Sequence, residues 1–150
     1  MSISAAITFR GFELTKTYRE TQKLSTTWAH FRVVLDSFQP QTMSDYPQCA
    51  QRLIEKFPHL RMHACDNETH SSFTRELATT EIPHALEHVM VELLAQESSL
   101  SRFDIKGQTG WDFKRDGYGV YRLRIKGFES EDQARRISQQ ACVIFQDLSR

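Results

Sequence analysis

The residues of this chain with the clearest chemical potential lie between positions 84 and 88, in the order His-Ala-Leu-Glu-His. On a helix, side chains four residues apart share one face, so His84 and His88 can bind one Zn²⁺ or a similar divalent ion together. Glu87 lies beside them, where its carboxylate can accept a proton from a water polarised by that ion. We therefore expect a metal site at His84 and His88, with Glu87 as the general base.

This order of residues, His-x-x-Glu-His, reverses the commoner metallopeptidase motif and is typical of the inverzincin class. It indicates hydrolysis of an amide bond by an activated water. A five-residue pattern also arises by chance, so two half-exposed helix histidines that bind nothing are the alternative at this point.

A metal with two histidine ligands needs a third protein ligand, and Glu92 is the first candidate. It lies four residues beyond His88 on the same helix face, and helical side chains lean toward the N-terminus. However, residues 84 and 92 are separated by about 12 Å of helix rise, so His84, His88 and Glu92 can all reach one metal ion only in a stretched geometry. Glu92 could instead orient one of the histidines by a hydrogen bond. Glu76 and Glu81, just before the helix, are rival third ligands.

The helix that must position these residues is expected to begin after Thr79 or Thr80, either of which can cap it, and to run to about Gln96. Pro83 suits an early helical position. The expected apolar positions of this helix are Leu86, Val89, Met90, Leu93 and Leu94.

Periodicity of the apolar residues predicts an α+β domain over residues 1–150, with helices packed on a mainly antiparallel sheet. Two further helices are expected, one from Tyr46 to Phe57 and one from Glu129 to Leu148. The expected strands are 7–14, 28–36, a short one at 73–77, and 118–128, while 15–27, 37–45 and 59–72 read as connections.

The connection 59–72 contains His63, Cys65, Asp66 and His70. These residues could form a second metal site, or Cys65 could act as a nucleophile beside a histidine. A polar loop without chemistry is the interpretation we favour for this cluster.

Two other groups of residues could bind a ligand. Trp111, Tyr118 and Tyr121 could line a groove, although core packing is the commoner role of aromatic residues. The three basic residues of the last strand could hold an acidic peptide or polymer, although a solvated sheet face is the simpler interpretation. They are Arg122, Arg124 and Lys126.

Composition narrows the class of protein. The chain has 19 Lys and Arg against 19 Asp and Glu, so its formal charge is zero and no general attraction to nucleic acid is expected. We find no secretory signal and no apolar stretch of membrane-spanning length, and therefore expect no membrane partner. Three cysteines without a paired spacing argue against a disulfide framework and suit a reducing compartment, so we expect the protein to be cytoplasmic.

A family resemblance rests on an ordered series of short motifs. The chain has Phe57-Pro58-His59-Leu60, then the Phe73 segment, then His84-Ala85-Leu86-Glu87-His88-Val89-Met90-Val91-Glu92-Leu93. It continues with Gly107-Gln108-Thr109, Gly119-Val120-Tyr121 and a closing helix containing Glu131, Ala134 and Arg135. Over residues 55–148 this series resembles the N-terminal domain of cyanophycin synthetase. Cyanophycin is a storage polymer with a polyaspartate backbone and arginine on its side chains.

The resemblance implies a function that involves this polymer. In that family the domain is associated with holding polymer and, in some members, with a zinc-peptidase-like site that cuts polymer into primers. Carried over by position, His84 and His88 would be ligands, Glu92 the third ligand and Glu87 the base. The synthetase also contains an ATP-grasp module and a ligase module, neither of which fits in 150 residues, so we expect a stand-alone relative.

The chain departs from the family pattern around the site. Gly110 and Trp111 follow the Gly-x-Thr turn where the family tends to have Arg. Pro83 replaces a common Gly, and residues 64–70 replace a loop rich in cysteine and glycine. These changes leave a choice between cyanophycin and another peptide or isopeptide as substrate. A non-catalytic polymer-binding module and a domain with a vestigial site are the alternative functions.

Overall fold

The fold is taken from a computed structural model, which describes residues 7–14, 28–36, 40–65 and 72–149. Its centre is a four-stranded antiparallel sheet in the order β1-β2-β4-β3. The strands are β1 (Ile7–Leu14), β2 (Trp28–Leu35), β3 (Lys106–Gly110) and β4 (Val120–Lys126). The helices are α1 (Pro47–Lys56), α2 (Phe73–Leu77), α3 (Ile82–Glu97), α4 (Phe113–Asp116) and α5 (Glu131–Leu148). Short 3₁₀ turns occur at η3 (Met43–Asp45), η4 (Pro58–Met62) and η5 (Arg102–Asp104).

The sheet has one buried face and one exposed face, as the alternation of its residues dictates. On β2, Ala29, Phe31 and Val33 are buried whereas His30 and Arg32 are exposed. The paired strand β4 follows the same pattern, because Ala29 lies opposite Ile125 and Arg32 lies opposite Arg122. The apolar face therefore has to be covered by helices.

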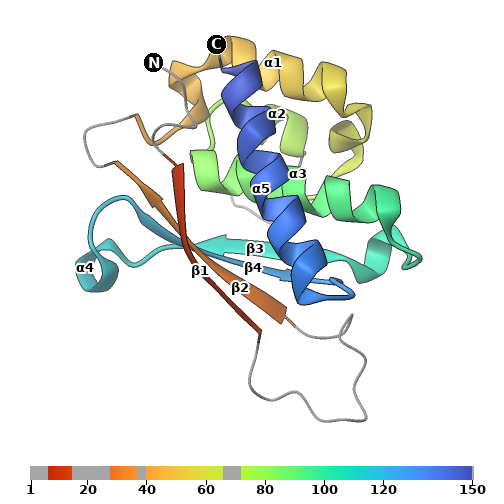
Figure 1. The fold of residues 1–150 in the computed structure, drawn as a ribbon. Helices are drawn as coiled ribbons and strands as arrows, with labels where there is room; N and C mark the ends of the chain where they lie inside the picture. Colours follow the sequence, from red (N-terminus) through yellow and green to blue (C-terminus); the bar gives the residue numbers. More distant parts are fainter. Residues whose placement is uncertain (1–6, 15–27, 37–39, 66–71, 150) are drawn as a thin grey trace.

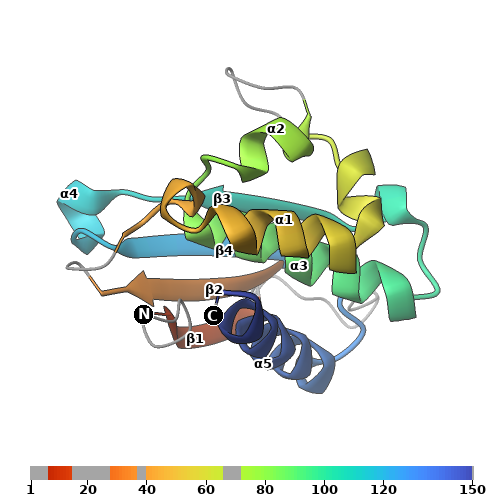
Figure 2. The same cartoon turned by 90° about the horizontal axis from the view of Figure 1, so that it is seen from above.

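Helices α3 and α5 provide this cover. Figures 1 and 2 show them side by side on one side of the sheet, with α1 beside them; α5 lies toward β1, and α2 lies toward β3. Buried residues of α5 repeat at helical spacing, at Ala134, Ile137, Ala141, Ile144 and Phe145, so one stripe of this helix joins the core. Ser130 begins α5 as a side-chain cap that accepts a hydrogen bond from the Gln133 N–H.

Gly119 allows the start of β4 to approach β2 closely. Its φ angle is +88°, and a Cβ atom at this position would lie 2.5 Å from the Leu35 carbonyl oxygen. The Leu35 N–H donates a 2.8 Å hydrogen bond to the Gly119 carbonyl, which extends the ladder between the two strands. A larger residue at 119 would break this pairing.

Most of the expected elements are confirmed, including the strands at 7–14 and 28–36, the long central helix and the final helix. The expected strand at 73–77 is wrong, because these residues form helix α2 and bury Phe73 and Leu77 one helical turn apart. Strand β3 was not expected, since its sequence Lys-Gly-Gln-Thr-Gly has two glycines and no large apolar residue.

The expected cap of the central helix is also wrong. Helix α3 follows Glu81 at the N-cap, without a side-chain cap hydrogen bond, and Thr80 has a different partner described below. Within the expected connection 59–72, η4 occupies the first residues and Ala64 forms a β-bridge with Ser72. The connection 15–27 lies outside the described residues.

Among the described helices, none combines the length and the apolar character needed to cross a bilayer.

Candidate metal centre

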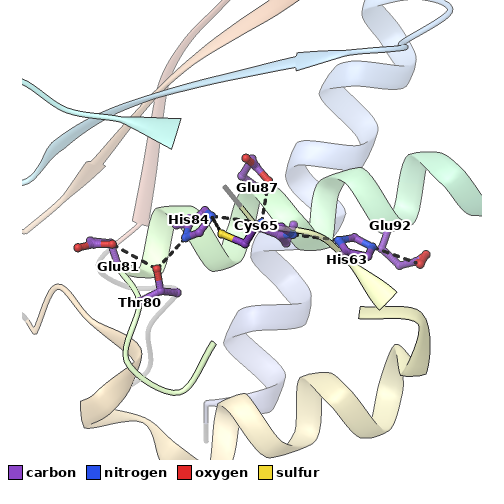
Figure 3. A network of polar contacts seen from close by, with 8 residues as sticks. His63, Cys65, Thr80, Glu81, His84, Glu87 and Glu92 are labelled. Carbon is purple, nitrogen blue, oxygen red and sulfur yellow. Dashed lines mark hydrogen bonds and ion pairs between the residues drawn. The ribbon is translucent and has the colours of Figure 1, made fainter. Parts of the chain in front are cut away.

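Helix α3 brings the two motif histidines together on its face toward the His63–Cys65 segment. The Nε2 atoms of His84 and His88 lie 3.2 Å apart, and the Sγ atom of Cys65 lies 3.5 Å from His84 Nε2. One ligand atom from each of these three residues lies within 4.8 Å of the other two. Figure 3 shows Cys65 against His84, with His63 further along the same row. Cys65, His84 and His88 could therefore hold a metal ion.

The other ring nitrogen of His84 is held by the residues just before the helix. Its Nδ1 lies 2.7 Å from the Thr80 hydroxyl oxygen, and this hydroxyl donates a 3.2 Å hydrogen bond to Glu81 Oε2. Because the single hydroxyl proton of Thr80 goes to the carboxylate, Thr80 accepts from His84, and Nδ1 carries the imidazole proton. His84 Nε2 is therefore unprotonated in the neutral ring.

A second chain of contacts holds His88. Its Nδ1 lies 2.9 Å from His63 Nδ1, and His63 Nε2 lies 3.7 Å from Glu92 Oε1. Arg102 Nη1 donates to both carboxylate oxygens of Glu92, at 2.5 and 2.7 Å, so the two groups form an ion pair. The carboxylate favours a proton on His63 Nε2, so His63 Nδ1 accepts from His88 Nδ1. His88 Nε2 is therefore also unprotonated.

Burial keeps these rings neutral. It lowers the pKa of His63 and His84 and lowers that of His88 well below its ordinary value; for His88, the neighbouring His84 and His63 add to the effect. The nearby Glu92 opposes this shift at His63, and Glu76 and Glu81 oppose it at His84. Neutral imidazole is the form that binds metal ions.

Two unprotonated nitrogens that face each other at 3.2 Å repel unless a cation lies between them. Tetrahedral zinc has bonds of about 2.1 Å to nitrogen and about 2.3 Å to sulfur, which place two nitrogens about 3.4 Å apart and nitrogen and sulfur about 3.6 Å apart. The His84–His88 separation of 3.2 Å and the His84–Cys65 separation of 3.5 Å are close to these values, and all three ligand atoms lie within 4.8 Å of one another. The residues present therefore fit a zinc-like ion.

The ring of His88 is also fixed by packing. The aromatic ring of Phe73, from α2, stacks on it with 3.7 Å between ring centroids and 13° between planes. Phe73 is fully buried, so His88 cannot rotate without disturbing the core.

Glu87 lies on the side of α3 that faces β3, away from the row of His84, Cys65 and His63 (Figure 3). Its Oε2 atom lies 3.6 Å from His88 Nε2, and the residue is only 3% exposed. Burial raises the pKa of Glu87 to about 8, so the carboxyl carries a proton at neutral pH unless a cation nearby lowers this value. Its position beside the ring nitrogens suits the expected general base.

The site opens into a cleft of about 1130 Å³ between α3, η4, α2 and strand β3. Its lining includes Glu76 and Glu81, the two rival third ligands, neither of which belongs to the Cys65, His84 and His88 group. Glu76 Oε2 is buried and has no hydrogen-bond partner among the described residues. The cleft thus contains an unsatisfied hydrogen-bond acceptor in addition to the three possible metal-ligand atoms.

The structure brings His84, His88 and Glu87 together, as the motif spacing indicates, and adds Cys65. It does not bring Glu92 to this group, because the Glu92 carboxylate binds Arg102 and lies beside His63. Metal ligation by Glu92 stays a prediction, and its contact with His63 agrees with the alternative that it orients a histidine.

The cluster in the connection 59–72 is divided by the structure. His63 and Cys65 do not form a separate site but join the motif histidines. Asp66 and His70 lie outside the described residues. The sequence has no spacing rule that links positions 63 and 65 to 84 and 88, so only the chain fold reveals their association.

The other candidate groups have mixed surroundings. Tyr121 is buried and donates a hydrogen bond to Gln41, whereas Trp111 and Tyr118 are largely exposed. Arg122 pairs with Asp116, and Arg124 lies over the Trp28 ring and donates to Gln108. These contacts agree with a solvated sheet face.

None of the three cysteines, Cys49, Cys65 and Cys142, forms a disulfide bond, as expected from their spacing. Burial raises the pKa of Cys49 to about 11 and that of Cys142 to about 12, which makes both thiols unreactive at neutral pH. Cys65 is thus the cysteine placed for metal chemistry.

Comparison with known proteins agrees with the motif series. No curated protein matches the chain. Residues 30–150 match the family described as the cyanophycin synthase-like N-terminal domain, and this match covers α3, the final helix and every cleft-lining residue except Trp28. The chain therefore belongs to the cyanophycin synthase-like N-terminal domain family.

Proposed function

We propose that this protein is a zinc-dependent hydrolase of amide bonds in cyanophycin or a related poly-amino acid. The observation that carries the proposal is the pair of Nε2 atoms of His84 and His88, 3.2 Å apart, with Cys65 Sγ and the Glu87 carboxyl beside them. The family membership supports the choice of polymer.

His84, His88 and Cys65 would hold the ion. Two imidazoles and one thiolate favour zinc over magnesium or calcium, which prefer oxygen ligands. Three protein ligands leave a fourth position open, as in catalytic zinc sites. When bound there, the ion supplies Lewis acidity, which polarises a carbonyl oxygen and acidifies water.

Glu87 is the residue placed to move the proton. In hydrolysis, the oxygen of water bonds to the amide carbon, the carbon–nitrogen bond breaks, and a proton goes to the leaving nitrogen. Glu87 accepts a proton from the attacking water and returns one to that nitrogen. Its burial excludes bulk water, and the positive charge of a cation nearby would lower its pKa and favour the ionised base.

Thr80 and His63 are positioning residues in this proposal. Each accepts a hydrogen bond from the Nδ1–H of one ligand histidine. Thr80 in turn donates to Glu81, and His63 lies beside the Glu92 carboxylate. Such partners fix the tautomer and orientation of a ligand histidine and raise its basicity.

The test combines metal content with cleavage of purified cyanophycin. Metal is measured by mass spectrometry on untagged protein, and cleavage is followed by newly formed amines. We expect about one zinc per chain, loss of this zinc in His84→Ala, and loss of cleavage with retained zinc in Glu87→Gln. Glu97→Gln, at an exposed position on the same helix, is the matched control and should keep both properties.

Three results would contradict this proposal in different ways. If the protein binds no zinc on titration, the proposed metal site does not exist. If Glu87→Gln keeps full activity, Glu87 is not the general base. Polymer binding that survives both chelator and Glu87→Gln, without any cleavage, would identify the non-catalytic binding module instead.

A further inference from the structure

Strand β3 forms one edge of the sheet, and its outer side faces the cleft that contains the candidate metal centre. The Leu35 N–H bonds to the Gly119 carbonyl, so alternation along antiparallel strands assigns the main chain of Arg122, Arg124 and Lys126 to the β3 side. Their partners Gly110, Gln108 and Lys106 are therefore the residues of β3 that bond to β4.

By the same alternation, the main-chain N–H and C=O groups of Gly107 and Thr109 point outward from the sheet. Among the described residues, no backbone hydrogen bond to these groups occurs outside the sheet ladder. An edge with free donors and acceptors is a template for a further strand. Natural proteins usually cover or charge such edges, but here it opens into the cleft.

The outward groups lie next to the candidate base. A Cβ atom on Gly107 would lie 2.6 Å from Glu87 Cδ, so the backbone of β3 passes against the Glu87 side chain. Adjacent strands are about 4.8 Å apart. A chain paired with Gly107 and Thr109 would therefore run through the cleft, with its amide bonds close to Glu87 and to the ring nitrogens.

The surroundings of β3 suit a peptide rather than solvent. Three of the five exposed large hydrophobic residues of the described chain, Met62, Phe103 and Trp111, line this same cleft. Phe103 precedes β3 and Trp111 follows it, so an apolar side chain lies beyond each end of the free edge. Exposed apolar groups gathered at a cleft are typical of a binding site.

We propose that the free edge of β3 binds the substrate as an extended α-peptide, which adds a fifth strand through hydrogen bonds to Gly107 and Thr109. This inference rests on the proposed function for its chemistry, and it specifies that the bond presented to Glu87 is a main-chain amide. Recognition by strand addition takes affinity from main-chain hydrogen bonds and specificity from alternate side chains.

The experiment measures binding in the presence of chelator, so it does not depend on metal or on hydrolysis. The probe is a fluorescein-labelled octa-aspartate backbone with arginine on every side chain, followed by fluorescence anisotropy. Thr109→Pro removes the outward N–H, and proline is tolerated where an edge N–H faces away from the sheet. Thr109→Val keeps this N–H and replaces the hydroxyl with a methyl group of similar size; the hydroxyl oxygen is buried without a hydrogen-bond partner among the described residues.

We expect Thr109→Pro to weaken binding at least tenfold and Thr109→Val to bind like the unaltered protein. Equal binding by Thr109→Pro, or no binding by the unaltered protein at millimolar probe, overturns the inference. Zinc content and cleavage by the unaltered protein are measured separately, so a failure of strand addition is distinguished from a failure of the metal site.

A second measurement covers the case in which Thr109→Pro does not fold. The unaltered protein is compared on two probes, one with backbone N-methyl groups on alternate residues and one with an N-methyl group on every residue. In an added strand only alternate N–H groups face β3, and a uniform chain can shift by one residue, so the first probe should keep binding and the second should lose it. Equal binding of the two methylated probes overturns the inference.

Discussion

Gly107 lies so close to Glu87 that any side chain at position 107 would meet the carboxyl group: the nearest carboxyl atom, Cδ, would be 2.6 Å from an added Cβ. This contact joins a glycine of the edge strand to the candidate base on α3. It explains why a residue with poor strand propensity occurs within a cleft-lining strand.

Gly107→Ala should displace Glu87 and reduce hydrolysis at least tenfold, because small displacements of a catalytic group are costly to the rate. The crowding should also lower the free energy of unfolding by about 1–3 kcal/mol. The checks are cleavage rate, zinc content and chemical denaturation. Gly110→Ala is the matched control, since an added Cβ there has no atom within 4 Å. Unchanged cleavage in Gly107→Ala would contradict the placement of Glu87.

Cys65→Ser and Glu92→Gln distinguish the two candidates for the third metal ligand. Because Cys65 Sγ lies 3.5 Å from His84 Nε2 whereas Glu92 binds Arg102, we expect Cys65→Ser to weaken zinc binding by at least 100-fold. Glu92→Gln should weaken it by about 10-fold, the effect of losing a partner of a ligand histidine. Zinc affinity is measured by competition with a chromophoric chelator. The opposite order of effects would make Glu92 the ligand.

The contact between His63 and His88 predicts a coupled effect on metal affinity. His63→Ala should weaken zinc binding by about 10- to 100-fold, because His88 Nδ1 loses its acceptor. Since Glu92 acts through His63, the double variant His63→Ala/Glu92→Gln should be no weaker than His63→Ala alone. His59→Ala changes an exposed histidine at the rim of the same cleft and should leave affinity unchanged. Additive losses in the double variant would rule out this relay.

The stability of the metal-free protein should depend on pH through Glu87. Its ordinary pKa is 4.5 and burial raises it to about 8, so between these values the folded state holds a proton that the unfolded chain has lost. This destabilises the folded protein increasingly as pH rises from 4.5 to 8. The advantage of Glu87→Gln over the unaltered protein should therefore grow with pH, by at most about 1.4 kcal/mol per pH unit.

The measurement is urea denaturation in chelator at several pH values between 5 and 8. The lowered pKa values of His63, His84 and His88 reduce the stability of both proteins in acid, below about pH 6.5, because the unfolded chain binds the extra protons. The difference between the two proteins removes this common effect to first order. A difference that does not change with pH would show that Glu87 titrates normally.

The sequence alone determined the parts of the site that belong to one helix. His84, Glu87 and His88 are related by a fixed helical spacing, so their common placement follows once the helix is recognised. The main strands and the final helix followed for the same reason, because each carries its own periodic pattern of apolar residues. The ordered motifs also indicated the family, which comparison of residues 30–150 confirmed.

Only the tertiary structure decided which other residues complete the site. His63 and Cys65 come to the histidines from a connection more than eighteen residues earlier, and Gly107 comes to Glu87 from the sheet edge. These contacts depend on how α3, η4 and β3 pack together, and no local periodicity encodes that packing. The same reason explains why Glu92, which shares the helix face by spacing, contacts Arg102 and His63 beside the candidate metal centre.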